Sequence, residues 1–184
     1  MNIIHEFEVA RPLGAVWQMF QDVPSVAQCL PGAELTEDKG NGVYAGKVSV
    51  KLGPIAATFE GEATISADAS AHRALIDGKG VDKRGGSRGS VKVSYALTDS
   101  GGGSTKVVID ADVTLAGPAA QFGRTGLINE MSSRLINDFS SCLEAKLGAP
   151  TEEEAGEIKA GEVQGFTLLW ESLVAWFKRL VGSR

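Results

Sequence analysis

Residues 88–115 read RGSVKVSYALTDSGGGSTKVVIDADVTL, and this stretch decides the fold. On both sides of its centre, apolar and polar side chains alternate with the period of two that is typical of a β-strand with one buried face. The glycine-rich segment Ser100–Ser104 predicts a hairpin loop between the two halves. The stretch therefore predicts two antiparallel strands, Arg88–Thr98 and Thr105–Leu115.

The same alternation continues toward the N-terminus. It predicts five more strands, at Asn2–Val9, Ala33–Thr36, Tyr44–Leu52, Phe59–Ile65 and Arg73–Gly80. Two short helices are expected after the first strand, near 12–22 and 25–29, because Pro12 suits the first position of a helix and Pro24 interrupts the pattern. Strands joined mainly by turns predict an antiparallel meander of seven strands.

A long helix is expected from Pro118 to Gly148, where Gly148 and Pro150 end it. Its apolar stripe consists of Ile128, Met131, Leu135, Phe139 and Cys142. A single helix can cover a curved sheet only by lying across its apolar face, which leaves a gap between the two layers. The expected fold class is α+β: a seven-stranded curved antiparallel sheet wrapped around a long C-terminal helix, in one domain over residues 1–147.

The remaining residues predict an appendage. Residues 151–164, TEEEAGEIKAGEVQ, carry five acidic residues and almost no large apolar ones, so burial cannot offset their ordering entropy. This composition predicts an acidic, flexible, solvated linker over residues 148–165. Residues 166–184 follow as a separate amphipathic helix.

On a helical wheel, the large apolar residues of that helix fall on one arc, with charged residues opposite. The predicted membrane-contacting residues are Phe166, Leu169, Trp170, Leu173, Val174, Trp176, Phe177, Leu180 and Val181, with Lys178 and Arg179 facing anionic lipid. No stretch approaches the roughly 20 apolar residues of a spanning helix, so the segment is predicted to lie in the membrane interface. Docking into a partner's groove or onto its own domain stays open.

Composition excludes several classes of function. The formal charge of −5, with 18 basic and 23 acidic residues and no long run of either sign, gives no footprint for nucleic acid. The only histidines, His5 and His72, form no metal-ligand spacing and no Ser-His-Asp triad, so no catalytic or metal residue is expected. Cys29 and Cys142 are far apart and no secretion signal precedes them, which predicts reduced thiols and a cytoplasmic protein at the inner face of the cell membrane.

Four segments carry a family resemblance: CLPGAE at 29–34, VKLGPI with ATFEG at 50–61, GKGVDKRGGS at 78–87 and LAGPAAQFGR at 115–124. Over residues 1–147 the chain resembles the CoxG family of carbon monoxide dehydrogenase subunits, within the START and polyketide-cyclase (SRPBCC) helix-grip superfamily. The resemblance implies a helix-grip fold around a lipid-sized cavity. It also implies a membrane-attached accessory protein of molybdenum hydroxylases, and it does not imply catalysis.

The residues expected to point toward the interior of the fold are the candidates for ligand binding. From the strands they are Phe7, Val50, Phe59, Ile76, Val93, Tyr95, Ile109 and Val113, and from the long helix Gln121, Phe122, Arg124, Thr125, Ile128, Met131 and Leu135. A filled core is the alternative for each apolar position. Space is favoured by small residues at inward positions, namely Gly61, Ala63, Gly78 and Ala111. Gln121, Arg124 and Thr125 predict a polar end for the cavity, although Arg124 fits a surface charge equally well.

Three functions follow as hypotheses. In the first, the chain is a non-catalytic accessory protein that binds an isoprenoid quinone or another membrane lipid, with no covalent cofactor, and links a carbon monoxide dehydrogenase or related hydroxylase to the cytoplasmic membrane. In the second, it is a recruitment scaffold with a closed core. In the third, it is a cyclase-like or hydrolytic enzyme, which would require an acid–base pair that the sequence does not clearly offer.

Overall fold

The computed structural model describes residues 1–52, 55–124 and 127–160, with side chains described outside 51–55 and 122–130. Its seven strands form one antiparallel sheet in the order β1-β7-β6-β5-β4-β3-β2. The strands are β1 (Asn2–Val9), β2 (Ala33–Gly40), β3 (Val43–Leu52), β4 (Ile55–Asp68), β5 (Arg73–Asp82), β6 (Ser87–Gly101) and β7 (Ser104–Ala116). The predicted fold class, an α+β chain with a seven-stranded antiparallel sheet, is confirmed.

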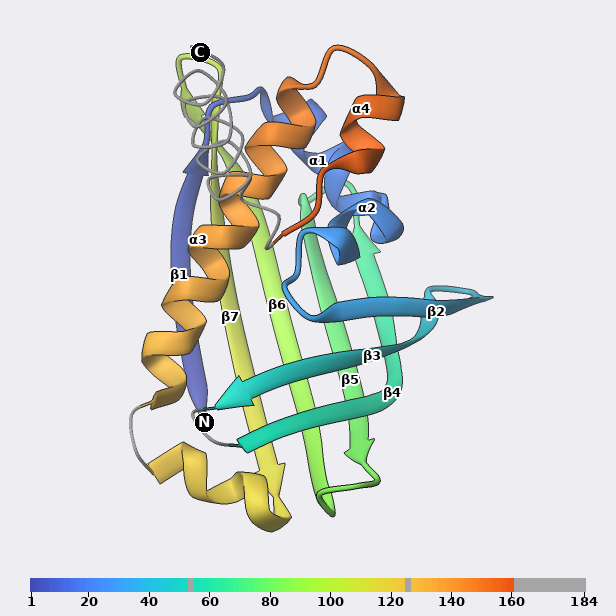
Figure 1. Cartoon of the computed structure of the whole chain (residues 1–184). Coiled ribbons are helices and arrows are strands. Elements are labelled where there is room, and N and C mark those ends of the chain that lie inside the picture. The colour runs from blue at the N-terminus through green and yellow to red at the C-terminus, as the bar shows by residue number, and fades with distance from the viewer. Residues whose placement is uncertain (53–54, 125–126, 161–184) are drawn as a thin grey trace, which may run out of the picture.

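Helices cover one face of this sheet. They are α1 (Leu13–Gln21), α2 (Val23–Gln28), the 3-10 helix η1 (Gly117–Arg124), α3 (Leu127–Gly148) and α4 (Glu152–Glu157). Helix α3 lies across β1 and β7, with α1, α2 and α4 gathered at its C-terminal end and η1 at the other (Figure 1). The prediction of one helix from Pro118 is wrong, because a separate 3-10 helix precedes α3. Glycines at 117 and 123 weaken an α-helix here, and Ser87 Oγ accepts a hydrogen bond from Ala119 N–H at 3.1 Å.

A row of glycines crosses the middle of the sheet. Gly46 of β3 pairs with Gly61 of β4, Gly61 with Gly80 of β5, and Gly80 with Gly89 of β6. A Cβ at Gly61 would lie only 1.8 Å from the Lys79 carbonyl oxygen, so only glycine allows this approach. Strand β4 bends sharply, and β3 crosses the direction of β5, β6 and β7 (Figure 1). The glycine row therefore supplies the close backbone packing that a strongly curved sheet needs.

The main core lies between the sheet and the C-terminal half of α3. Phe139, Cys142 and Leu143 are buried there, and Phe139 packs edge-on to Phe20 with the ring centroids 6.0 Å apart. A disulfide joins Cys29, at the end of α2, to Cys142. The prediction of reduced thiols is therefore wrong, because the fold brings together two cysteines that lie 113 residues apart.

Residues after α3 fold back onto the domain. Ile158 and Ala160 pack against the main core, and the buried ammonium of Lys146 donates to the carbonyl oxygen of Ala155 at 2.7 Å. Burial lowers the pKa of Lys146 from its ordinary value. In the structure, two apolar residues and one buried lysine attach this acidic stretch to the domain as far as Ala160, while Thr151–Glu154 stay exposed, so the predicted linker over 148–165 remains a prediction. Residues 161–165 lie outside the described range.

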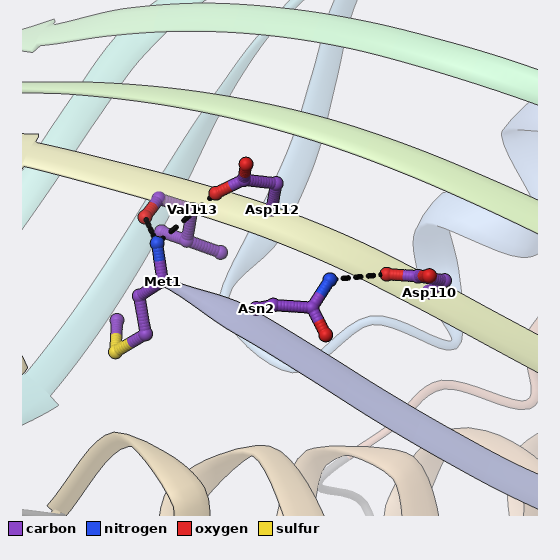
Figure 2. Close-up of polar contacts among 5 residues, drawn as sticks. All are labelled: Met1, Asn2, Asp110, Asp112 and Val113. Atoms are coloured by element: carbon purple, nitrogen blue, oxygen red, sulfur yellow. Dashed lines mark hydrogen bonds and ion pairs between the residues drawn. The ribbon is translucent and has the colours of Figure 1, made fainter.

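The N-terminus is held at the junction of β1 and β7 (Figure 2). The ammonium of Met1 donates to Asp112 Oδ1 at 3.0 Å and to the Val113 carbonyl oxygen at 2.9 Å. The side-chain amide of Asn2 donates to Asp110 Oδ1 at 2.6 Å. These contacts extend the pairing of β1 with β7 to the first residue.

Candidate functional site: an apolar cavity

A cavity of about 450 Å³ lies between α2 and the inner face of the bent sheet. This volume is within the range of small-molecule sites. Helix α2 contributes Val23, Val26 and Ala27, and Leu30 lies two residues after the helix. The sheet contributes mainly apolar and small residues, namely Ala33, Leu35, Tyr44, Ala45, Val48, Phe59, Ala63, Ile65, Ile76, Val91, Val113 and Leu115, and five glycines at 46, 61, 78, 80 and 89. The site therefore suits a largely apolar ligand.

Exposure along the inner surfaces shows that the space is open. Val48 shares the inner face of the sheet with Phe59, its register partner, yet is 44% exposed. On α3, Phe139 is 4% exposed, but Leu135, one turn earlier on the same side, is 37% exposed. A large apolar side chain left open on a core-facing surface lacks a packing partner. The tight packing at the C-terminal half of α3 thus loosens toward Leu135, although Ser132 Oγ of α3 still lies 2.9 Å from His5 Nε2 of β1.

Small residues create this space. Gly61, Ala63 and Gly78 line the cavity, as their inward positions predicted, whereas Ala111 is not among the lining residues. A Cβ at Gly78 would lie 3.0 Å from Val91 Cγ1 and 3.8 Å from Ala63 Cβ, so a larger residue would crowd the wall. The hollow therefore depends on the small volume of these side chains.

Only part of the predicted ligand-binding set lines the cavity. Phe59, Ile76 and Val113 do so, and Val50 and Met131 belong to a second cluster with Ala119, Phe59 and Leu115. Phe7, Tyr95 and Ile109 instead belong to or pack against the filled core, where burial raises the pKa of Tyr95. Val93 is half-buried and outside the lining, and Gln121 is exposed on η1. Leu135, also predicted to bind the ligand, is 37% exposed on α3 and is not a lining residue. The side chains of Phe122, Arg124 and Ile128, residue Thr125, and every predicted membrane-contacting residue from Phe166 to Val181 lie outside the described residues.

The helical wall of the cavity was not predicted. Val23, Val26, Ala27 and Leu30 follow the spacing i, i+3, i+4, i+7 of a helix with one apolar face. That signal was present in the sequence, but the helix is only six residues long and offered little pattern. The alternation along the strands predicted only those lining residues that belong to the sheet.

Four charged residues, Glu34, Lys47, Glu62 and Lys79, are also among the lining residues, and the alternation along their strands directs these side chains to the outer side of the sheet. Lys47 pairs with Glu34 at 2.8 Å, and Lys39 pairs with Glu62. On β1, the half-buried His5 has its Nε2 2.9 Å from Ser132 Oγ of α3, and His5 is not a cavity-lining residue. Among the described residues, no three His, Cys, Asp or Glu side chains come together as metal ligands would. The chemistry that the site offers is apolar binding.

Residues 6–148 match the family described as the CoxG subunit of carbon monoxide dehydrogenase. The chain belongs to the CoxG family. Among proteins with curated functions, none matches this CoxG-family chain. None of the helices in the described part of the chain combines the length and apolar character that crossing a bilayer requires.

Solved structures share the fold of this CoxG-family chain. A conserved protein from Geobacillus kaustophilus is 16% identical with a TM-score of 0.71, covering 80% of this chain and 95% of its own. The Zhui aromatase/cyclase from Streptomyces sp. R1128 is 17% identical with a TM-score of 0.58, covering 81% and 96%. A START superfamily protein from Mycobacterium smegmatis is 11% identical with a TM-score of 0.54, covering 79% and 96%. At these identities the similarity shows the START-type helix-grip fold alone.

Proposed function

We propose that this protein is a non-catalytic accessory protein of a carbon monoxide dehydrogenase or related molybdenum hydroxylase, and that its cavity carries an apolar membrane molecule. The observation that carries the proposal is the open hollow, where Val48 is 44% exposed on an apolar inner wall. An empty surface of this kind gains free energy when an apolar ligand covers it. The partner enzyme is proposed from the description of the family, which names a subunit of carbon monoxide dehydrogenase.

An isoprenoid quinone is the ligand proposed. A volume of about 450 Å³ lies in the lower part of the range of about 300–1,000 Å³ that small-molecule sites cover. This space suits a ring and the first part of an isoprenoid chain, with the rest of a long chain leaving through the open side. An oxidising hydroxylase must pass its electrons on, and a protein that shields a quinone's tail would bring the acceptor to it.

The C-terminal segment 166–184 is proposed to hold the protein at the cytoplasmic membrane. Its apolar arc and basic residues support peripheral binding in the interface. The compartment is open to a direct test, because disulfides are rare in the cytoplasm. The Cys29–Cys142 disulfide of the structure therefore counts against the cytoplasmic face. Alkylation of thiols in intact cells decides the point, because complete oxidation of this pair in the cell would contradict the proposed cytoplasmic location.

Native mass spectrometry of the full chain, purified from bacterial membranes, tests the carrier function. A co-purifying molecule with the mass of a quinone is expected. An empty chain that still binds the hydroxylase would favour a recruitment scaffold instead.

An enzyme of the cyclase type is the second candidate, because the Zhui aromatase/cyclase shares the fold. Glu34 and Lys47 lie on the outer side of the sheet and pair with each other, and Glu62 pairs there with Lys39. An acid or base must reach the reacting atoms of its substrate, so their outward position supports binding over catalysis. A catalysed change in a bound polyketide-like substrate would reverse this preference.

A further inference from the structure

Helix α2 forms the helical wall of the cavity, but its own packing holds it only weakly in place. It has six residues, and none of them is buried. Helices this short are marginal in water and rely on contacts with other elements. Val23 and Ala27 line the hollow, where an empty space offers their side chains no packing atoms. The position of this wall therefore depends on how the helix is fastened to its neighbours.

Two residues of α3, one turn apart, hold the C-terminal end of α2. Cys142 forms the disulfide with Cys29, the residue directly after the helix. Lys146, four positions further along α3, donates from its ammonium to Oε1 of Gln28, the last residue of α2, at 2.8 Å. The Gln28 carbonyl oxygen also accepts a hydrogen bond from Ala160 N–H at 2.8 Å. Because positions i and i+4 lie on one face of a helix, a single face of α3 clasps the end of the wall.

The disulfide is the firmest of these links. Cys29 is completely buried and Cys142 is 6% exposed, and both belong to the main core. A hydrogen bond to Gln28 can be exchanged for one to water at little cost in free energy, whereas the covalent bond cannot. Breaking the disulfide leaves the end of α2 attached by exchangeable hydrogen bonds and by the contact of Val26 and Leu30 with the core.

The chemistry that breaks this bond is thiol–disulfide exchange. A thiolate of a dithiol protein attacks one sulfur of the pair, so that the bond between the two cysteines breaks and a mixed disulfide forms. The second thiol of the reductant then displaces the protein's sulfur. The reductant loses two electrons and two protons and becomes a disulfide, and Cys29 and Cys142 become thiols. Local opening of the weakly packed α2 gives a reductant access to the buried sulfurs.

We propose that Cys29–Cys142 is a redox-modification site for a dithiol protein of the thioredoxin class, and that its state controls whether α2 closes the cavity. The inference rests on the proposed function, because the controlled cavity is the proposed carrier site. The oxidised pair keeps α2 against α3 and retains the apolar ligand. The reduced pair frees the end of α2, so that the wall moves and the ligand exchanges faster.

Hydrogen exchange of the oxidised and the reduced full chain measures the wall directly. Dithiothreitol should raise the exchange rate of peptide 23–30 about tenfold or more, if the clasp keeps the wall closed about nine-tenths of the time or longer. Peptides of β6 and β7 should stay protected in the same time window. Equal rates for 23–30 in the two states would overturn the proposal. A uniform increase along the whole chain would overturn it as well, because that result reports a loss of global stability.

The double variant Cys29→Ser with Cys142→Ser provides the control for effects of dithiothreitol itself. It should match the reduced wild type in the exchange of 23–30 and should not respond to dithiothreitol. A variant that still responds would overturn the assignment to this pair. The comparison of the oxidised with the reduced wild type needs no substitution, so it decides the question even where the serine pair does not fold.

Release of ubiquinone-1, a quinone with one isoprene unit, measures the consequence for the cavity. Its transfer from the full chain to phosphatidylcholine vesicles in stopped flow should be about tenfold faster from the reduced chain, if the oxidised wall is open about a tenth of the time. Equal transfer rates from the two states would overturn the control of the cavity by this pair.

Thioredoxin with its reductase and NADPH tests the proposed reactant. This system should reduce the pair in the folded chain, so that mass spectrometry finds two alkylated thiols per chain. A pair that yields to dithiothreitol in urea but resists thioredoxin without urea would overturn the redox site. A chain whose wall loosens on reduction but which binds no ubiquinone-1 would support the redox site and refute the quinone carrier. A chain that binds ubiquinone-1, with the same wall exchange in both states, would support the carrier and refute the redox site.

Discussion

Two leucines on α3 provide a matched test of the hollow. Leu143 is completely buried in the main core, and Leu135, about two turns earlier on α3, is 37% exposed. Leu143→Ala and Leu135→Ala remove the same atoms from the same helix. Differences in helix propensity therefore cancel between the two variants.

The expected losses differ because only one site is tightly packed. Leu143→Ala should lower the free energy of unfolding by about 3 kcal/mol or more, since it removes buried apolar groups and leaves a cavity. Three carbons at about 0.8 kcal/mol each, scaled by the buried fraction of Leu135, give about 1.5 kcal/mol for Leu135→Ala. No cavity penalty is added there, because the surroundings are already open.

Urea denaturation of the full chain measures both values, provided that the dependence on urea concentration stays constant between variants. The gap between the two losses should be about 1.5 to 2 kcal/mol. Equal losses would refute the reasoning, because the N-terminal half of α3 would then pack against the sheet as tightly as its C-terminal half.

Three further predictions concern stability. In thermal melts, Gly61→Val should destabilise the chain by about 3 kcal/mol or more, because the Cβ of the valine would clash with the Lys79 carbonyl oxygen. The control Gly14→Ala, in α1 with open space around it, should stabilise the chain by about 0.5 kcal/mol. Reducing Cys29–Cys142 should cost about 4 to 5 kcal/mol for a loop of this length, seen as a lower urea midpoint with dithiothreitol, and an unchanged midpoint would contradict the role of the disulfide. Burial lowers the pKa of Lys146 below its ordinary 10.5. Just below pH 10.5 the lysine is therefore protonated more in the unfolded chain than in the folded one. The free energy of unfolding should thus increase as the pH rises toward 10.5. Lys146→Met should remove this pH dependence and speed hydrogen exchange over 152–160; a pH profile identical to the wild type would exclude the assignment.

The sheet could be predicted because alternation along each strand reports its buried face directly. It does not report what lies opposite that face. Tyr95 and Ile109 have inward parity just as Phe59 and Val113 do, but Trp17 and Phe20 of α1 fill the space near Tyr95 and leave the space near Phe59 open. Whether an inward-facing residue lies in the core or in the cavity therefore depends on its position along the strand. Which positions are covered depends in turn on where the helices pack, and the strand pattern does not report that.

Long-range contacts set the other limits of prediction. The disulfide joins residues 113 positions apart, and no local pattern announces it. The docking of 149–160 involves Ile158, Ala160 and the buried Lys146, a residue type that composition alone assigns to the surface. The wall formed by α2 was detectable from its apolar spacing, but a helix of six residues gives a weak periodic signal.

The pairing of β1 with β7 has a consequence for biosynthesis. Asn2 meets Asp112 and Val9 meets Thr105, so the first strand to leave the ribosome pairs with the last strand of the sheet. At about 5–20 residues per second, translation of the intervening hundred or so residues takes about 5 to 20 s. During that time the edge and the apolar face of the nascent first strand have no native partner, so this is the interval in which ribosome-associated chaperones would protect the chain from aggregation.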